Sequence, residues 1–266
     1  MDIRNSSVDK SGGSAARLAD INSSFTPVPD GFRATKRNQR VIYSTLSEET
    51  IRHLVIEHYG FDEGVKCVFY FRGVNDVYLL STHTKQFALR ISPTNWRTGA
   101  AIAGELVTLN HLGNKGVGVA LPVRRTDGTF ITDIAAPEGT RKAVCFNWAS
   151  GQIPKYTSRM DNLRYGIHLA RIHQASEDLP IQETRPKIDM DYLLWRSIRA
   201  LQPLVEVLPK VSNDLNALAR RMSCQLASAL PSLNDFGLCH GDVSIHNARI
   251  DSDSVVLFDF DFCGYG

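Results

Sequence analysis

Long apolar runs and paired cysteines are both missing from this sequence of 266 residues. Without a run of about 18 apolar residues, no membrane-spanning helix is expected, and the N-terminus has no apolar stretch of the kind that forms a secretory signal. The five cysteines form no C-x-x-C pair and their number is odd, which argues against a disulfide framework. We therefore expect a cytoplasmic protein with reduced thiols and no membrane partner.

An excess of charge of one sign is also absent. The formal net charge is +2, which is too small to indicate a nucleic acid partner. Apolar residues make up 43% of the chain and charged residues 22%, as in ordinary globular proteins. Residues 1–40 are polar without a sustained period, and we expect a flexible leader there. Its basic stretch "FRATKRNQR" leaves a nucleic-acid-binding arm as the weaker alternative.

Strand-like segments follow the leader. A short helix is expected first, because Thr45 and Glu48 have the spacing of a capping box and Gly60 can end a helix. The segments "VKCVFYF", "DVYLLS" and "FALRI" are rich in β-branched and aromatic residues and are separated by short turns, which predicts an antiparallel meander. A helix over about 99–112 should come next, followed by strands at "VALPV", "TFITDI" and "KAVCFNW".

Helical periodicity dominates the chain after "ASGQIP". Apolar residues recur at helical spacing in three stretches, which begin near Leu163, Leu193 and Leu215. His173 ends the first of these stripes, and we expect it to be buried. A strand-rich region with one inserted helix is thus followed by a helical region, and a protein with two such parts usually binds its ligand between them.

Polar residues gather near the end of the sequence. His240, Gly241 and Asp242 are followed by Asn247, and an apolar segment then leads to Asp259. The segments "ARI" and "VVLF" can pair as a hairpin across "DSDS", which would bring Asn247 and Asp259 together. A carboxylate and an amide oxygen held close together suit a hard cation such as Mg²⁺, and a second carboxylate can orient a hydroxyl group and accept its proton. These groups favour phosphoryl transfer.

A zinc-dependent hydrolase is the weaker interpretation of the same region. Cys239, His240, Asp242 and His246 are close in sequence. However, no H-x-x-x-H helix or C-x-x-C pair frames them.

The pattern H-G-D-x-x-x-x-N followed by "LFDFD" resembles the catalytic loop and metal-binding segment of the aminoglycoside phosphotransferase and choline kinase-like family. Within this family, the sequence most resembles the homoserine kinase type II and bacterial stress-response kinase branches. The resemblance extends from about residue 65 to 266. It implies an α+β, bilobal protein-kinase-like fold, in which an antiparallel sheet with one helix forms the N-terminal lobe. The C-terminal lobe would be mainly helical and truncated, because more helices follow the metal-binding aspartate in relatives.

The same resemblance implies where the parts of the chain begin and end. After the leader over 1–40, a nucleotide-binding lobe would cover 41–143 and a hinge 144–151. The catalytic lobe would cover 152–266.

Each motif residue receives an expected role from the resemblance. Asp242 would be the catalytic base, and His240 would support its loop. Asn247 and Asp259 would be the metal ligands. Asp261, two positions after Asp259, is similar to an acidic residue that is common in the family, and we expect a structural or supporting role for it.

The nucleotide site is expected on the strand-rich side. Arg90, in "FALRI", would contact phosphate, and Glu105 on the inserted helix would be its ion-pair partner. Gly73 lies in a hairpin similar to the family's nucleotide-covering hairpin, although a full G-x-G-x-x-G is absent. Backbone groups from Phe146 to Trp148 would meet the adenine.

The implied activity is transfer of the γ-phosphate of ATP, with Mg²⁺, to a hydroxyl group of a small molecule such as an aminoglycoside, an amino alcohol or a homoserine-like acceptor. A truncated or non-catalytic nucleotide-binding pseudoenzyme is the alternative, and a Ser/Thr protein kinase of the stress-response type is a further one. The identity of the acceptor and the oligomeric state stay open.

Overall fold

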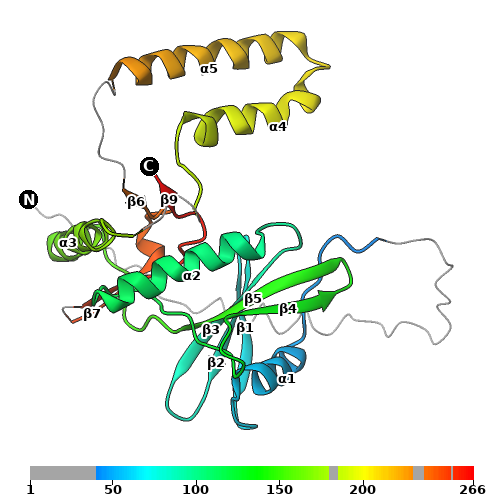
Figure 1. Ribbon diagram of the computed structural model, residues 1–266, viewed down its shortest axis with the longest axis vertical. Helices are drawn as coiled ribbons and strands as arrows, with labels where there is room; N and C mark the ends of the chain where they lie inside the picture. The colour runs from blue at the N-terminus through cyan, green and yellow to red at the C-terminus, as the bar shows by residue number, and fades with distance from the viewer. Residues whose placement is uncertain (1–39, 180–184, 230–236, 253) are drawn as a thin grey trace, which may run out of the picture. The chain divides into compact units, whose positions relative to one another are not determined.

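The computed structural model describes residues 40–179, 185–229, 237–252 and 254–266 (Figure 1). Residues 41–266 belong to one compact unit. The leader expected over 1–40 lies outside the described residues, apart from Arg40. Within the described ranges, no helix combines the length and the apolar character needed to cross a membrane.

The first helix, α1, covers Glu48–Tyr59. It begins after Ser47, whose hydroxyl accepts a hydrogen bond from the backbone of the third residue along, and it ends at Gly60 with φ of 68°. A left-handed residue after the last turn favours glycine, as predicted. The predicted capping box was wrong, because the hydroxyl of Thr45 instead accepts a hydrogen bond from a strand arginine.

A five-stranded antiparallel sheet in the order β1-β2-β3-β5-β4 follows α1 along the chain (Figure 1). Its first three strands confirm the predicted meander. The register between β1 and β2 shifts between Phe69 and Phe71, at the β-bulge beside the hairpin turn. The five strands are Lys66–Arg72, Asp76–Ser81, Gln86–Ser92, Ile131–Ala136 and Gly139–Asn147.

The predicted strand at "VALPV" forms only two isolated bridges. Val119 pairs with Leu257, whereas Pro122 pairs with Phe146 of β5. The segment therefore passes from one partner strand to another within a few residues. A proline also lacks the N–H that would extend a regular ladder.

The inserted helix, α2, covers Gly99–Asn114, and Thr98 caps it by accepting a hydrogen bond from the backbone of Ala101. Its apolar side packs into a core that also takes in Val144 and Phe146 from the sheet and residues of the C-terminal strands. A second core joins α1 to residues of β2, β3 and β5. The helix that carries Glu105 thus lies against both the sheet and the C-terminal segment.

Helices dominate the next part of the chain, as the periodicity predicted. They are α3 (Arg159–Ala175), the π-turn η3 (Asp191–Trp195), α4 (Arg196–Val205) and α5 (Pro209–Ala229). The C-terminal part consists of β6 (Leu238–Cys239), η4 (Ile245–Asn247), β7 (Ala248–Asp251), β8 (Ser254–Leu257) and β9 (Gly264–Tyr265).

The predicted hairpin is confirmed. Strands β7 and β8 pair antiparallel, with Ala248 opposite Leu257 and Asp251 opposite Ser254. The segment before β7 and the segment after β8 are therefore adjacent, as the hydrogen bond from the Phe258 N–H to the carbonyl of Asn247 shows. The α+β class expected from the sequence is the one observed.

Candidate active site

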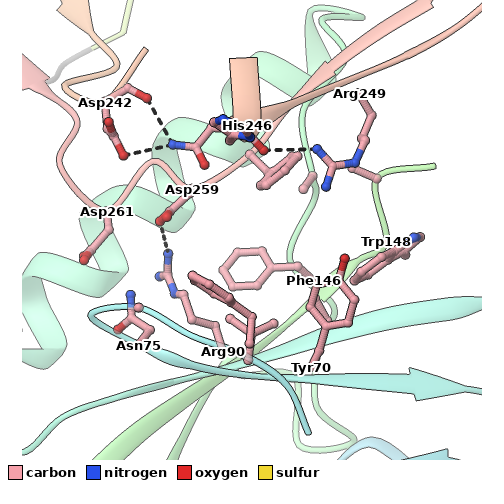
Figure 2. A pocket seen from close by; sticks show the side chains of 18 of the residues that line it. Tyr70, Asn75, Arg90, Phe146, Trp148, Asp242, His246, Arg249, Asp259 and Asp261 are labelled. Carbon is pink, nitrogen blue, oxygen red and sulfur yellow. Dashed lines mark hydrogen bonds and ion pairs between the residues drawn. The ribbon is translucent and has the colours of Figure 1, made fainter. Parts of the chain in front are cut away.

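A cavity of about 550 Å³ brings together residues of the sheet, of α2 and of the C-terminal hairpin. Figure 2 shows the side chains that surround it. Eight of the nine residues proposed from the sequence line this cavity, namely Gly73, Arg90, Glu105, Phe146, Trp148, Asp242, Asn247 and Asp259. The ninth, His240, is not among the lining residues.

The predicted ion pair between Arg90 of β3 and Glu105 of α2 is confirmed. Two hydrogen bonds join the groups, at 2.8 Å from Nη1 to Oε1 and 2.6 Å from Nη2 to Oε2. Arg90 is 8% exposed and Glu105 is 1% exposed. Burial would lower the pKa of Arg90, but Glu105 and Asp259 raise it, so the guanidinium stays charged. The geometry fixes a positive group in the wall of the cavity.

Asp259 follows β8 and has a φ of 64°, so the backbone turns sharply at this residue. Its Oδ1 lies 3.5 Å from Nη1 of Arg90, and no hydrogen-bond partner reaches this buried atom within the described part of the chain. Burial raises the pKa of Asp259, and Arg90 opposes that effect. An unpartnered buried carboxylate oxygen is costly, and a bound cation would satisfy it.

The side chains of Asp242 and Asn247 are joined directly by a hydrogen bond. The Asn247 Nδ2 donates to Oδ2 of Asp242 at 2.9 Å and to its carbonyl oxygen at 3.1 Å. The amide oxygen of Asn247 takes no part in these bonds, so it is the atom that can ligate a cation. Asp242 itself is exposed, and its second carboxylate oxygen can accept a proton from a bound hydroxyl group.

The glycine between His240 and Asp242 has a packing reason. Gly241 has a φ of 84°, and a Cβ on it would lie 2.2 Å from the carbonyl oxygen of Phe262. Any other residue would push the loop away from the segment after β8. The glycine of the H-G-D motif thus keeps Asp242 near the metal-binding segment.

His240 lies behind the loop and outside the cavity. It is 3% exposed, its Nε2 is 3.1 Å from the carbonyl oxygen of Phe258, and its Nδ1 accepts a hydrogen bond from the backbone N–H of Asp242. These contacts place the proton on Nε2. Burial lowers the pKa of His240, which favours this neutral form. The position fits the expected support of the loop and gives no contact with a ligand in the cavity.

Asp261 has a structural position, as expected. Its carboxylate accepts hydrogen bonds from Trp96 Nε1 and Arg97 Nε, both at 2.8 Å. Burial alone would raise the pKa of Asp261, but Arg90, the Trp96 indole and Arg97 together lower it. This carboxylate therefore joins the segment after β8 to the loop before α2.

Several lining residues were not predicted. Tyr70 and Asn75 come from the β1–β2 hairpin, and Arg249 lies on β7. The buried side chain of Asn75 has an Oδ1 without a hydrogen-bond partner among the described residues. The position of Asn75 after Gly73 was the only signal in the sequence. Nothing in the sequence singled out Arg249.

The residues present fit a magnesium ion better than zinc. The described residues contain no group of three or more His, Cys, Asp or Glu side chains that could hold a metal. Zinc sites use such sets, whereas Mg²⁺ is commonly held by one or two protein oxygens together with water and phosphate. The Asp259 carboxylate and the Asn247 amide oxygen are a set of the second kind.

The chain matches a protein family and is similar in sequence to several other proteins. Residues 73–266 match the phosphotransferase enzyme family. The chain is 34% identical to an uncharacterized protein of Synechocystis over 227 residues. The aligned part covers 85% of this chain and 63% of that protein. It is 26% identical to homoserine kinase of Neisseria meningitidis, over 82% of this chain and 67% of the kinase. The chain thus spans less than two thirds of the length of the Synechocystis protein.

Solved structures share the fold. An amicoumacin kinase in complex with AMP-PNP, Ca²⁺ and Ami has a TM-score of 0.66 at 21% identity, over 83% of this chain and 66% of its own. A microcompartment-associated aminopropanol kinase has a TM-score of 0.61 at 21% identity, over 82% of this chain and 70% of its own. Both support the α+β, protein-kinase-like fold that the sequence pattern implied.

Proposed function

Since the chain belongs to the phosphotransferase enzyme family, we propose that it transfers the γ-phosphoryl group of ATP to a hydroxyl group of a small molecule. The observation that carries this proposal is the shared cavity. A buried cation from the sheet, a carboxylate after β8 with one buried oxygen that accepts no hydrogen bond within the described residues, and an exposed carboxylate before β7 all face the same space. Phosphoryl transfer requires these three kinds of group together.

The nucleotide would be held mainly by the sheet. Arg90 can contact phosphate oxygens because Glu105 fixes its guanidinium, and Gly73 lies in the hairpin that lines the same cavity. Phe146 and Trp148 line the part of the cavity where the strand β5 ends, which suits a flat base. Within this proposal the nucleotide-binding lobe covers 41–143, the hinge 144–151 and the catalytic lobe 152–266.

The acceptor would be activated by Asp242. Its carboxylate would orient the hydroxyl group and take its proton, while the Asn247 amide holds the carboxylate in place. Asn247 and Asp259 would hold Mg²⁺, which when bound would supply positive charge against the phosphate oxygens. His240 would fix the backbone of the loop.

An amino alcohol is the class of acceptor that we propose. Among the similar proteins are a homoserine kinase, an amicoumacin kinase and an aminopropanol kinase. Homoserine and aminopropanol carry both an amino group and a hydroxyl group. A panel of amino alcohols, aminoglycosides and homoserine, each tested with labelled ATP, would identify the acceptor.

The test of the mechanism is Asp242→Asn, which keeps the shape of the side chain and removes the base. We expect kcat to fall at least a hundredfold, while the affinity for ATP measured by calorimetry changes little. Asp251→Asn is the matched control, because Asp251 is an exposed carboxylate at the other end of β7. Turnover that survives in Asp242→Asn would show that this residue is not the base. Nucleotide binding without turnover in the unaltered chain would favour the non-catalytic alternative.

A further inference from the structure

One charged residue of the cavity has no role in the mechanism above. Arg249 lies on β7, two residues after Asn247, between the buried residues Ala248 and Ile250. It lines the same cavity as Arg90 and Asp259. Figure 2 shows it at the end of the cavity where Trp148 and Tyr70 lie, away from Arg90.

The guanidinium of Arg249 is held in a fixed position. Its Nη1 donates to the carbonyl oxygens of His246, at 3.0 Å, and of Ala248, at 2.7 Å. Its central carbon lies 5.0 Å from the centre of the Phe258 ring. Both Nη1 protons are therefore used. The Nε and Nη2 protons form the opposite edge, and neither has a hydrogen-bond partner within the described ranges of the chain.

This edge is a fixed pair of donors without a protein acceptor among the residues that the structure describes. Such an edge is best matched by two acceptor atoms side by side in one plane. The surrounding side chains indicate what kind of group supplies them. Tyr70 and Trp148 are in contact edge to face, with ring centres 5.2 Å apart, and Phe146 also lines the cavity. Aromatic walls of this kind suit a flat heteroaromatic ring.

The two common purines differ at the edge formed by position 6 and N7. Guanine presents O6 and N7, which are both acceptors, whereas adenine presents the N7 acceptor beside the N6 amino donor. A guanidinium edge can therefore form two hydrogen bonds with guanine but only one with adenine, and its second donor would face another donor.

We propose that Arg249 reads the nucleobase of the phosphoryl donor and makes this site bind guanine nucleotides more tightly than adenine nucleotides. The proposal rests on the proposed function, because it places the base at the aromatic end of the cavity with its O6 and N7 edge toward Arg249. It replaces ATP by GTP as the expected donor and leaves the roles of Asp242, Asn247 and Asp259 as they are.

The test compares the binding of ADP, GDP and IDP to the whole chain by calorimetry. IDP shares O6 and N7 with GDP but lacks its amino group. We expect GDP and IDP to bind about tenfold more tightly than ADP, as a bidentate arginine contact predicts. In Arg249→Leu this difference should vanish, mainly through weaker binding of GDP and IDP. In the unaltered protein, 7-deaza-GDP, which lacks the N7 acceptor, should also lose most of the advantage.

A matched control is available in the segment before β4. Arg124 also lies over an aromatic ring, with 4.5 Å to the centre of Phe130, and donates to the backbone carbonyl of Gly128. It does not line the cavity. Arg124→Leu should therefore leave the ratio of GDP to ADP affinity unchanged.

Each outcome decides between the two proposals. Equal or tighter binding of ADP in the unaltered protein would overturn the role of Arg249 and leave the proposed function intact. A preference for GDP without turnover would support the role of Arg249 and count against the proposed function. If no nucleotide binds, both are wrong. Since 7-deaza-GDP needs no variant, the test holds even where Arg249→Leu fails to fold.

Discussion

At the scale of single residues, the most buried charges lie outside the cavity. Asp76 and Arg141 are both 0% exposed and form an ion pair at 2.9 Å. Arg141 also donates to the carbonyl oxygens of Ser92 and Ser44, and Asp76 also accepts a hydrogen bond from Arg72. The desolvation cost of both charges is offset only because all of these partners are present.

Asp76→Asn should therefore destabilise the protein strongly. The change removes the nearer of the two counter-ions of the buried Arg141, because Glu138 remains at 3.9 Å, and the loss of a buried ion pair costs about 3–5 kcal/mol. We expect the lower end of that range, because the carbonyl partners remain. Urea denaturation at pH 7 measures the change in the free energy of unfolding. Asp133→Asn, which removes an exposed pair with Lys142, should cost less than about 1 kcal/mol. A similar small cost for Asp76→Asn would contradict the prediction.

Sequence reasoning located the residues of local motifs and missed residues that pair at long range. The contact between Asp242 and Asn247 spans five positions, so its spacing is visible in the chain. The partners Asp76 and Arg141 are 65 positions apart. A single charged residue within a strand pattern resembles an exposed one, because the sequence does not show which partner covers it.

The same limit explains the error at His173. The apolar stripe was assumed to face the core, but Leu163 is 55% exposed and Ile167 is 46% exposed. His173 is exposed, and it is His168 that is buried, at 5%. The buried residues of α3 are His168 and Ile172, and periodicity alone cannot identify the neighbours that cover this side of the helix.

At the scale of elements, hydrogen bonds from two groups of side chains hold α2 and the loop before it to the segment after β8. Asp261 of that segment binds the loop before α2, as described above. Arg185 supplies the second link, since its buried guanidinium donates to the carbonyl oxygens of Ala101 on α2 and of Phe260, Asp261 and Cys263. Glu105 and Asp259 thus sit on elements that are held to one another.

Arg185→Met should loosen this link. Four carbonyl oxygens lose a charged donor, and we expect the free energy of unfolding to fall by about 2–4 kcal/mol. Hydrogen exchange followed by mass spectrometry should become faster in residues 260–263 and in the first turns of α2, while α1 is unaffected. Arg199→Met is the control, because Arg199 forms an exposed pair with Asp191. Unchanged exchange in residues 260–263 would show that Arg185 does not hold the segment.

Elements with a strong local pattern were predictable, and those defined by distant contacts were not. The β7–β8 hairpin and the meander both combine apolar runs with short turns, which a sequence displays directly. The segment around Pro122 has the same apolar character, yet it bridges two separate strands. Its conformation is decided by which strands lie nearby, and no local pattern carries that information.

At the scale of the whole molecule, a buried histidine connects separate parts of the described unit. His168 lies on α3, and its Nε2 is 2.9 Å from the carbonyl oxygen of Gly118. The neighbouring Val119 pairs with Leu257 of β8. A carbonyl partner for Nε2 requires the proton to be on that nitrogen. Burial lowers the pKa of His168 and Arg171 adds to this effect, whereas the hydrogen bond to Gly118 opposes it in part.

The stability of the whole fold should therefore depend on pH below neutrality. An unfolded chain binds a proton at His168 near its ordinary pKa of about 6.5, whereas the folded protein binds it only at lower pH. Stability is then complete above about pH 6.5 and falls as the pH decreases toward the folded pKa, with a slope of at most about 1.4 kcal/mol per pH unit for this one proton. The buried His240, whose pKa burial also lowers, contributes in the same direction.

His168→Gln separates this contribution from the rest. Glutamine can still donate to the carbonyl of Gly118 but does not titrate, so the loss of stability between pH 7.5 and pH 5.5 should become smaller. His173→Gln is the control substitution, because His173 is an exposed histidine on the same helix. Both variants are measured by urea denaturation at the two pH values. An unaltered pH dependence in His168→Gln would mean that this histidine accepts its proton equally well in the folded and unfolded chain, and that burial beside Gly118 does not control its charge.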